Sequence, residues 1–175
     1  MKIAIAGYGY VGKAVEAYLH KTEHTTQIVD PKYSNMSVLD TKCDGIIICV
    51  DTPANEDGSC DMSNVIDVLN DTHTEKPVLI KSTISIQGWE RIKEIFPSHT
   101  ISFSPEFIRA DTAIEDMLNT KTIYIGGGHY YFWERVLNRP DKAVKIKHAH
   151  PRAVSYTHLR AHETVLDLVC RLLLE

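Results

Sequence analysis

The chain has 175 residues, of which 43% are hydrophobic, and a formal net charge of −4. This length suffices for one well-buried globular domain. Lysine and arginine are scattered, so no basic stripe indicates nucleic acid as a partner. The longest apolar run, residues 46–50, is too short to span a bilayer, and the N-terminus lacks a signal-peptide pattern. We therefore expect a cytoplasmic protein without a membrane segment.

The first thirty residues predict a strand, a glycine turn, a helix and a second strand. Residues 3–6 are apolar and lead directly into the glycine-rich turn. Gly7 permits a tight turn, Gly9 lets backbone N–H groups approach a pyrophosphate, and Gly12 lets the helix pack closely on the strand. The pyrophosphate would then lie at the positive end of that helix. The pattern predicts a dinucleotide site.

An acidic residue ends the second apolar run. Residues 28–29 are followed by Asp30, whose carboxylate can accept hydrogen bonds from both ribose hydroxyls of an adenosine and would repel a 2′-phosphate. This favours NAD over NADP, although Lys32 nearby leaves NADP open. A glycine-rich hairpin without a ligand fits poorly, because helix-forming residues 13–17 follow Gly12 directly.

The rest of the chain alternates between apolar strand patterns and helical patterns. Residues 46–50 are apolar on both faces, as expected of a central parallel strand covered by helices on both sides. The alternation predicts right-handed crossovers and an α/β fold with a doubly wound parallel sheet over residues 1–150, a Rossmann-like domain. Further strands are expected at 77–80, 101–103, 122–125 and 143–146, and helices at 37–41, 62–69, the segment before Pro97, 112–118 and 129–137.

Local patterns add three expectations. Thr112 and Glu115 have the spacing of a capping box. The glycines at 126–128 are interpreted as a flexible connection that breaks a strand, rather than as a second phosphate loop. One face of the helix before Pro97 is expected to carry Trp89, Ile92, Ile95 and Phe96.

The cysteines and histidines give no metal-binding pattern. The four cysteines lie far apart without C-x-x-C spacing, which argues against a zinc site and against a disulfide framework. We expect no bound metal and reduced, structural thiols. The cysteines are Cys43, Cys49, Cys60 and Cys170.

Polar side chains follow three of the expected strands, where open α/β sheets bind their ligands. Thr52 can offer a hydroxyl to a cofactor or be an ordinary loop threonine. Thr83 can cap the next helix, orient a water, or do both. Glu106 is either a site carboxylate or a solvated loop acid.

Several motifs occur together in a specific order. They are Gly7-Tyr8-Gly9-Tyr10-Val11-Gly12, Asp30, Asp51-Thr52-Pro53, Lys81-Ser82-Thr83, and Ser104-Pro105-Glu106-Phe107 with Thr112-Ala113. From residue 1 to about 127, and more loosely to 146, the chain resembles the N-terminal NAD-binding domain of the UDP-glucose/GDP-mannose dehydrogenases. Enzymes like these oxidise the C6 hydroxyl of a nucleotide-linked sugar to a carboxylate, in two NAD-dependent steps through a thioester on a cysteine.

The resemblance implies roles for individual residues. Glu106 would lie beside the sugar as an acid–base or water-positioning carboxylate, and Thr83 would share the catalytic site. The substrate would be a nucleotide sugar, UDP-glucose in the first place, and the full-length protein would be a homodimer. The implied NAD-binding residues are Gly7, Gly9, Tyr10, Val11, Gly12, Asp30, Thr52 and Thr83.

The chain also departs from the family pattern. Ala110 stands where a second glutamate is usual, Asp51 where proline is usual, and Asp111 where glycine is usual. The family's central and C-terminal domains, with the nucleophilic cysteine and its lysine partner, lie beyond this chain, so we expect that the 175 residues alone do not complete the oxidation. Alternatives are the NAD domain of a β-hydroxyacid dehydrogenase and a non-catalytic NAD-binding module.

The segment 154–175 differs from everything before it. Residues 154–164 and 167–175 resemble a translated sequencing-library adapter, separated by an interval the size of a sample index. We expect this tail to be non-native, and we exclude it from functional reasoning. The alternative is a genuine C-terminal helix, since Leu166, Val169 and Leu173 would share an apolar face.

Overall fold

The computed structural model describes residues 1–56, 59–106 and 108–151. The expectation of a non-native tail at 154–175 concerns residues outside the described part. The strands are β1 (Lys2–Ala6), β2 (Thr25–Val29), β3 (Gly45–Ile48), β4 (Val78–Ile80), β5 (Ile101–Phe103), β6 (Thr122–Gly127) and β7 (Lys145–Ala149). The helices are α1 (Tyr10–Leu19), α2 (Ser63–Asn70), α3 (Ile86–Ile95), α4 (Ala113–Asn119) and α5 (Tyr130–Leu137).

All these strands form one mostly parallel sheet, in the order β2-β1-β3-β4-β5-β6-β7. β1 lies between β2 and β3, with Ala6 paired to Val29 on one side and to Ile48 on the other. β1, β2 and β3 run parallel, so the segments that follow these three strands meet at one edge of the sheet. The predicted α/β fold class is confirmed.

The expectation of a wholly parallel sheet is wrong at one position, because β6 runs antiparallel to β5. Parallel neighbours need a crossover that returns the chain to the starting end of the sheet. The short α4 packs against α1 instead, so β6 enters from the opposite end. β6 and β5 pair only at Ser102 with Gly127 and at Phe103 with Gly126, so the first two of the three glycines belong to the strand rather than breaking it.

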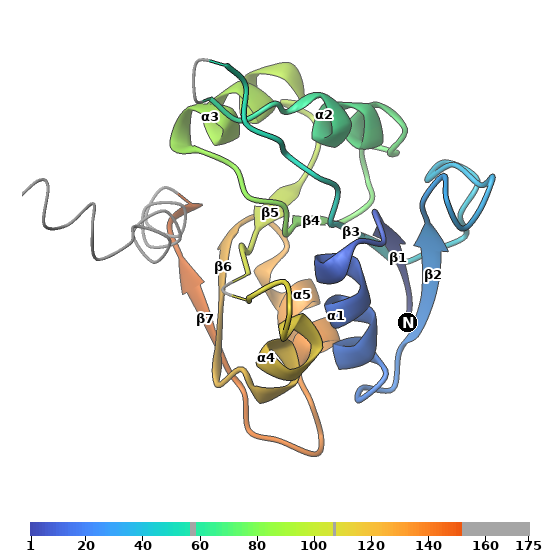
Figure 1. Ribbon diagram of the computed structural model, residues 1–175, viewed down its shortest axis with the longest axis vertical. Coiled ribbons are helices and arrows are strands. Elements are labelled where there is room, and N and C mark those ends of the chain that lie inside the picture. Colours follow the sequence, from blue (N-terminus) through green and yellow to red (C-terminus); the bar gives the residue numbers. More distant parts are fainter. Residues whose placement is uncertain (57–58, 107, 152–175) are drawn as a thin grey trace, which may run out of the picture.

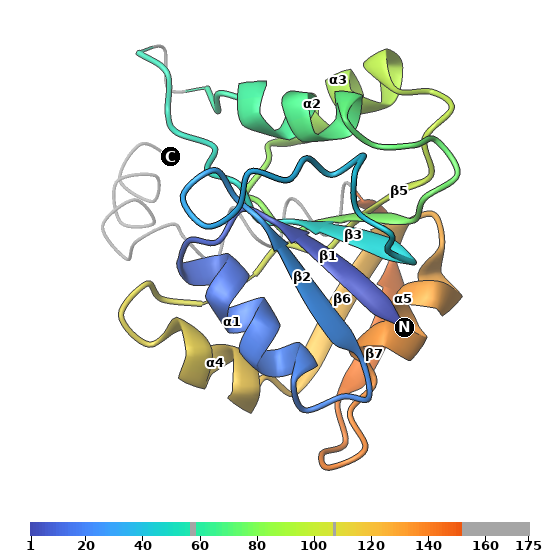
Figure 2. The ribbon, with the colours of Figure 1, turned by 90° about the vertical axis from the view of Figure 1, so that its right-hand side faces the viewer.

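Helices cover both faces of the sheet, as Figures 1 and 2 show, with α2 and α3 on one side and α1, α4 and α5 on the other. Neighbouring residues of a strand point to opposite faces. In β3, Ile46 and Ile48 join the core under α2 and α3, whereas Ile47 joins the core under α1, α4 and α5. This explains why the strand is apolar at every position.

Three local predictions are wrong. Ile95 is 45% exposed, because in a helix it lies roughly 120° from Trp89, outside the buried face that Trp89 and Ile92 share. Thr112 makes no capping box, since its hydroxyl donates to Asp116 Oδ2 over 2.9 Å. Residues 37–41 form turns and no helix: the Thr41 N–H donates to the Val38 carbonyl three residues back, and the Ser37 and Asp40 side chains hydrogen-bond to each other and to the local backbone.

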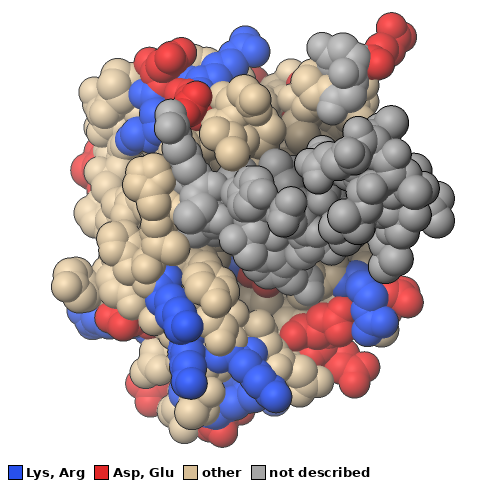
Figure 3. All heavy atoms as spheres, turned by 90° about the vertical axis from the view of Figure 1, so that its left-hand side faces the viewer, with Lys and Arg blue, Asp and Glu red and all other residues tan. Residues whose placement is uncertain are grey.

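None of the helices in the described residues is both long and apolar enough to cross a membrane. On the face drawn in Figure 3, lysine and arginine side chains lie beside aspartate and glutamate side chains. The basic groups on that face therefore do not form one continuous surface.

Candidate functional site

The glycine turn lies where β1 meets α1, and its backbone geometry requires glycine at its first position. Gly7 has φ +90°, and a Cβ there would lie 2.7 Å from the carbonyl carbon of Cys49 and from the nitrogen of Val50. The Gly7 N–H donates to the Val29 carbonyl over 2.9 Å. The turn is thus pressed against the end of β3 and tied to the end of β2.

The other two glycines have different surroundings. A Cβ on Gly12 would lie 2.2 Å from the Gly7 carbonyl oxygen, so α1 can approach the turn this closely only without a side chain there. A Cβ on Gly9 would meet nothing within 4 Å. Gly9 precedes the first residue of α1, and no side chain caps that helix end. Its open side therefore exposes the positive end of α1, which suits a phosphate group.

Asp30 stands just after β2 and beside the turn. Its Oδ2 accepts the Tyr8 N–H over 2.7 Å, and its Oδ1 accepts the Lys32 N–H over 2.9 Å. Each carboxylate oxygen has a second lone pair that can still accept a ribose hydroxyl. The two backbone donors therefore fix the orientation of the carboxylate before any ligand arrives.

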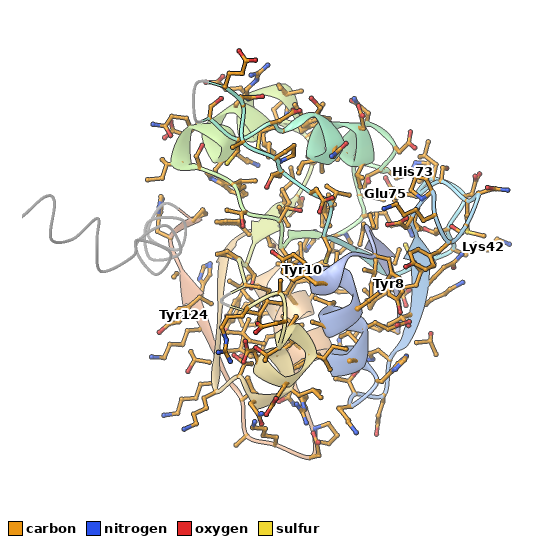
Figure 4. The ribbon with its side chains drawn as sticks, in the orientation of Figure 1. Tyr8, Tyr10, Lys42, His73, Glu75 and Tyr124 are labelled. Carbon is orange, nitrogen blue, oxygen red and sulfur yellow. The ribbon has the colours of Figure 1, made fainter. Side chains whose placement is uncertain are left out.

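These residues line one cleft of about 1660 Å³ at the carboxyl ends of β1, β2 and β3. Gly7, Gly9, Tyr10 and Asp30 contribute to its wall, and Figure 4 shows Tyr8 and Tyr10 near the start of α1. The opposite walls come from the segment after β2, from one side of α2 and the residue after it, and from the segment around α4. This is the crevice in which open α/β sheets hold a dinucleotide.

Four residues of the predicted NAD-binding set do not line the cleft, namely Val11, Gly12, Thr52 and Thr83. Val11 is half-buried and packs against the core under α1, α4 and α5. Gly12 is held against Gly7 below the cleft floor. Both support the turn from behind, and neither offers a side chain to the cleft.

Tyr8 is a wall residue that sequence reasoning left out. Its hydroxyl donates to Glu16 Oε2, and that hydrogen bond together with burial raises the pKa of Tyr8 to about 12. Its ring meets Tyr33 edge-on with the centroids 5.0 Å apart. The aromatic pair stands next to Asp30 in the wall of the cleft. In the sequence, the position of this tyrosine between Gly7 and Gly9 was the signal that could have identified it as a wall residue.

Thr52 and Thr83 come together at the ends of β3 and β4. The Thr52 hydroxyl donates to the Thr83 carbonyl over 2.7 Å, and the neighbouring Ser82 hydroxyl donates to the Val50 carbonyl over 2.7 Å. The two strand ends are thus joined by side-chain hydrogen bonds. Neither threonine lines the large cleft, so the structure groups them separately from Gly9 and Asp30.

Glu106 is also outside the cleft wall, and it has a partner that sequence reasoning missed. Lys81, at the end of β4, forms an ion pair with Glu106 Oε1, and the Lys81 side chain is fully buried. The Lys81 ammonium also donates to the Ser104 carbonyl over 3.1 Å and to the Ser104 hydroxyl over 3.3 Å. Burial lowers the pKa of Lys81 to about 7. The ion pair with the Glu106 carboxylate favours the ammonium form.

The described cysteines lie in or beside the core. Cys43 and Cys49 are buried and Cys60 is half-buried, all three as free thiols. Burial raises the pKa of Cys49 to about 12, so this thiol is not a nucleophile at neutral pH. This agrees with the expectation of a structural thiol. Within residues 1–56, 59–106 and 108–151, no three His, Cys, Asp or Glu side chains are grouped so that they could hold a metal ion.

A parallel sheet with a glycine turn at a helix start and an acid after the second strand defines the dinucleotide-binding class of α/β domains. Residues 33–136 match the UDP-glucose/GDP-mannose dehydrogenase family, NAD binding domain. The chain belongs to this family, as its motifs predicted.

Individual relatives agree with this assignment. The UDP-glucose 6-dehydrogenase of Rickettsia felis is 33% identical over 91 residues, which are 47% of this chain and 20% of that protein. An uncharacterized protein of Methanocaldococcus jannaschii is 29% identical over 91 residues, 47% of this chain and 10% of its own length. A UDP-glucose dehydrogenase structure from Pyrobaculum islandicum superposes with a TM-score of 0.76 at 20% identity, covering 91% of this chain and 48% of that one. The chain therefore spans half or less of these relatives.

Proposed function

We propose that this chain is the NAD-binding portion of a nucleotide-sugar 6-dehydrogenase, which oxidises the C6 hydroxyl of UDP-glucose to a carboxylate with two NAD. The observation that carries the proposal is that Gly9, Tyr10 and Asp30 line one cleft beside the start of α1. An extended dinucleotide needs these elements together: an exposed helix N-terminus for its pyrophosphate and a carboxylate for its adenosine ribose.

The chain's own residues would bind the cofactor in a fixed orientation. Asp30, already oriented by the N–H groups of Tyr8 and Lys32, accepts the ribose hydroxyls and repels a 2′-phosphate. Gly9 leaves room for the pyrophosphate to reach the N–H groups at the start of α1. NAD, when bound, supplies the hydride acceptor for each oxidation step.

The sugar end is assigned to the ends of β3, β4 and β5. Thr52 and Thr83 would lie at the nicotinamide end, where their mutual hydrogen bond fixes the two strand ends. Glu106 would accept a proton or hold a water beside the sugar. UDP-glucose is proposed as substrate because a relative from Rickettsia felis has that specificity in its name. A homodimer is proposed for the full-length protein.

Two alternatives make different demands. A β-hydroxyacid dehydrogenase domain shares the glycine turn, but it gives no reason for Lys81-Ser82-Thr83 and the Ser104–Glu106 segment to occur together. A non-catalytic NAD-binding module needs no further residues, whereas the dehydrogenase needs a downstream cysteine and lysine. Sequencing the natural reading frame beyond this chain separates the dehydrogenase from the module.

Calorimetry on the purified chain tests the proposal directly. We expect NAD to bind, and NADP to bind more weakly because of its 2′-phosphate. ADP-ribose, which carries the pyrophosphate and the adenosine ribose without the nicotinamide, should retain most of the affinity. A folded chain that shows no heat with millimolar NAD would refute the proposal.

A further inference from the structure

The ion pair between Lys81 and Glu106 is a buried pair at adjacent strand ends. Lys81 follows the last residue of β4, and Glu106 lies in the segment after β5, the neighbouring strand. The side chain of Lys81 is 0% exposed and that of Glu106 is 9% exposed. The carboxylate is therefore turned inward, toward the lysine.

Packing alone does not account for a lysine at this position. Burying an ammonium group is unfavourable unless it is paired and hydrogen-bonded, and an apolar side chain of similar volume often serves stability as well or better. Here the ammonium is satisfied by three acceptors, namely Glu106 Oε1 and the carbonyl and hydroxyl oxygens of Ser104. These three contacts compensate for burying the charge of Lys81.

The contacts decide the protonation state and orientation of the carboxylate. A positive charge against a carboxylate favours its ionised form. Lys81 occupies Oε1, so Oε2 is the atom that remains for a further partner. Cys49, the other titratable group that interacts with Lys81, stays a neutral thiol at physiological pH, because burial raises its pKa to about 12. It therefore does not compete with Glu106 for the ammonium.

We propose that Lys81 is a positioning residue that holds Glu106 as a carboxylate with one oxygen turned inward, so that Glu106 acts as a proton acceptor or water acceptor and not as a proton donor. This rests on the proposed function only for the role of Glu106 beside the sugar. The ion pair with Lys81 favours the proton-acceptor role of Glu106 over the proton-donor role, a choice that the family resemblance left open.

The test measures the titration of Glu106 in the intact chain, by NMR of its carboxyl carbon. In the wild type the ammonium of Lys81 favours the ionised form of Glu106. In Lys81→Met the carboxylate loses its partner while it stays buried, so its pKa should rise by about 1 or more. Lys81→Arg keeps the charge and should restore most of the wild-type value. An unchanged Glu106 titration in a folded Lys81→Met chain would overturn the proposal.

A reciprocal variant keeps the test decisive if Lys81→Met does not fold. In Glu106→Gln, the Lys81 ammonium loses its counter-charge, so NMR of its ε-carbon should show a lower Lys81 pKa than in the wild type. An unchanged Lys81 pKa would refute the electrostatic coupling between Lys81 and Glu106. NAD binding is measured on each variant in parallel. If the two groups are coupled and the wild-type chain does not bind NAD, the proposed function alone is refuted; if the wild-type chain binds NAD and the two groups are not coupled, the positioning role alone is refuted.

Discussion

The backbone N–H of Tyr8 donates a 2.7 Å hydrogen bond to the carboxylate of Asp30, and so joins the glycine turn to the end of the neighbouring strand β2. The glycine turn and the acid at the end of β2 are therefore one structural unit. A change in either should affect both the affinity for the dinucleotide and the choice between NAD and NADP.

Replacing Asp30 tests this unit. Asp30→Ala removes the acceptor for the ribose hydroxyls and leaves the Tyr8 and Lys32 N–H groups without their partner. Hydrogen bonds to a charged group contribute about 1.5–3 kcal/mol each, so calorimetry should show a loss of NAD affinity on the order of 10- to 100-fold. Asp30→Asn keeps one acceptor oxygen and removes the charge, so its ratio of NADP to NAD affinity should rise. Unchanged NAD affinity in a folded Asp30→Ala chain would contradict the assigned role.

Replacement by alanine should affect NAD affinity at one glycine of the turn and stability at another. A Cβ on Gly9 meets nothing within 4 Å, so Gly9→Ala should keep the wild-type Tm and lose NAD affinity, because the methyl group occupies the path of the pyrophosphate. A Cβ on Gly12 would lie 2.2 Å from the Gly7 carbonyl oxygen, so Gly12→Ala should lower the stability by about 1–3 kcal/mol. Thermal unfolding and NAD titration of both variants check this. A Gly9→Ala chain that binds NAD as well as the wild type would argue against a pyrophosphate at this site.

Acid should weaken the start of α4. The Arg109 side chain, its backbone N–H and the Thr112 hydroxyl lower the pKa of Asp116 to about 2. A carboxyl whose pKa is lower in the folded than in the unfolded state stabilises the fold above its unfolded pKa of about 4. That contribution is lost as the pH falls from about 4 toward 2. Wild type should therefore have a higher Tm than Asp116→Asn at pH 5, with the difference vanishing near pH 2. A difference independent of pH would contradict this.

The thiols should differ in reactivity. Cys49 is buried with a pKa raised to about 12, whereas Cys60 is half-buried. Brief treatment of the native chain with iodoacetamide, followed by peptide mass spectrometry, should modify Cys60 before Cys49. Denaturant should equalise the two, which provides the control. Rapid alkylation of Cys49 in the native chain would show that this thiol is accessible and ionised.

Local patterns predicted much of this fold because they reflect local physics. The order of strands and helices follows from apolar periodicity, and the expected strands and helices from residue 46 onward lie within a few residues of those observed. Gly7 and Asp30 were identifiable because a left-handed turn and a strand-end acid have direct chemical reasons at those positions. Family membership followed from several such motifs in order.

Other features depend on which elements become neighbours. The antiparallel placement of β6 follows from the packing of α4 against α1, and no pattern within β6 reports it. The prediction of a capping box at Thr112 was wrong because the Thr112 hydroxyl donates its hydrogen bond to Asp116, one helical turn later.

The sequence by itself determined a dinucleotide-binding α/β domain, its glycine turn and its acid, because each of these depends on residues close together along the chain. Only the tertiary structure decided that Lys81 and Glu106 form a pair. They lie 25 positions apart in the sequence and meet because β4 and β5 are adjacent and parallel, so that their carboxyl ends lie at the same edge of the sheet.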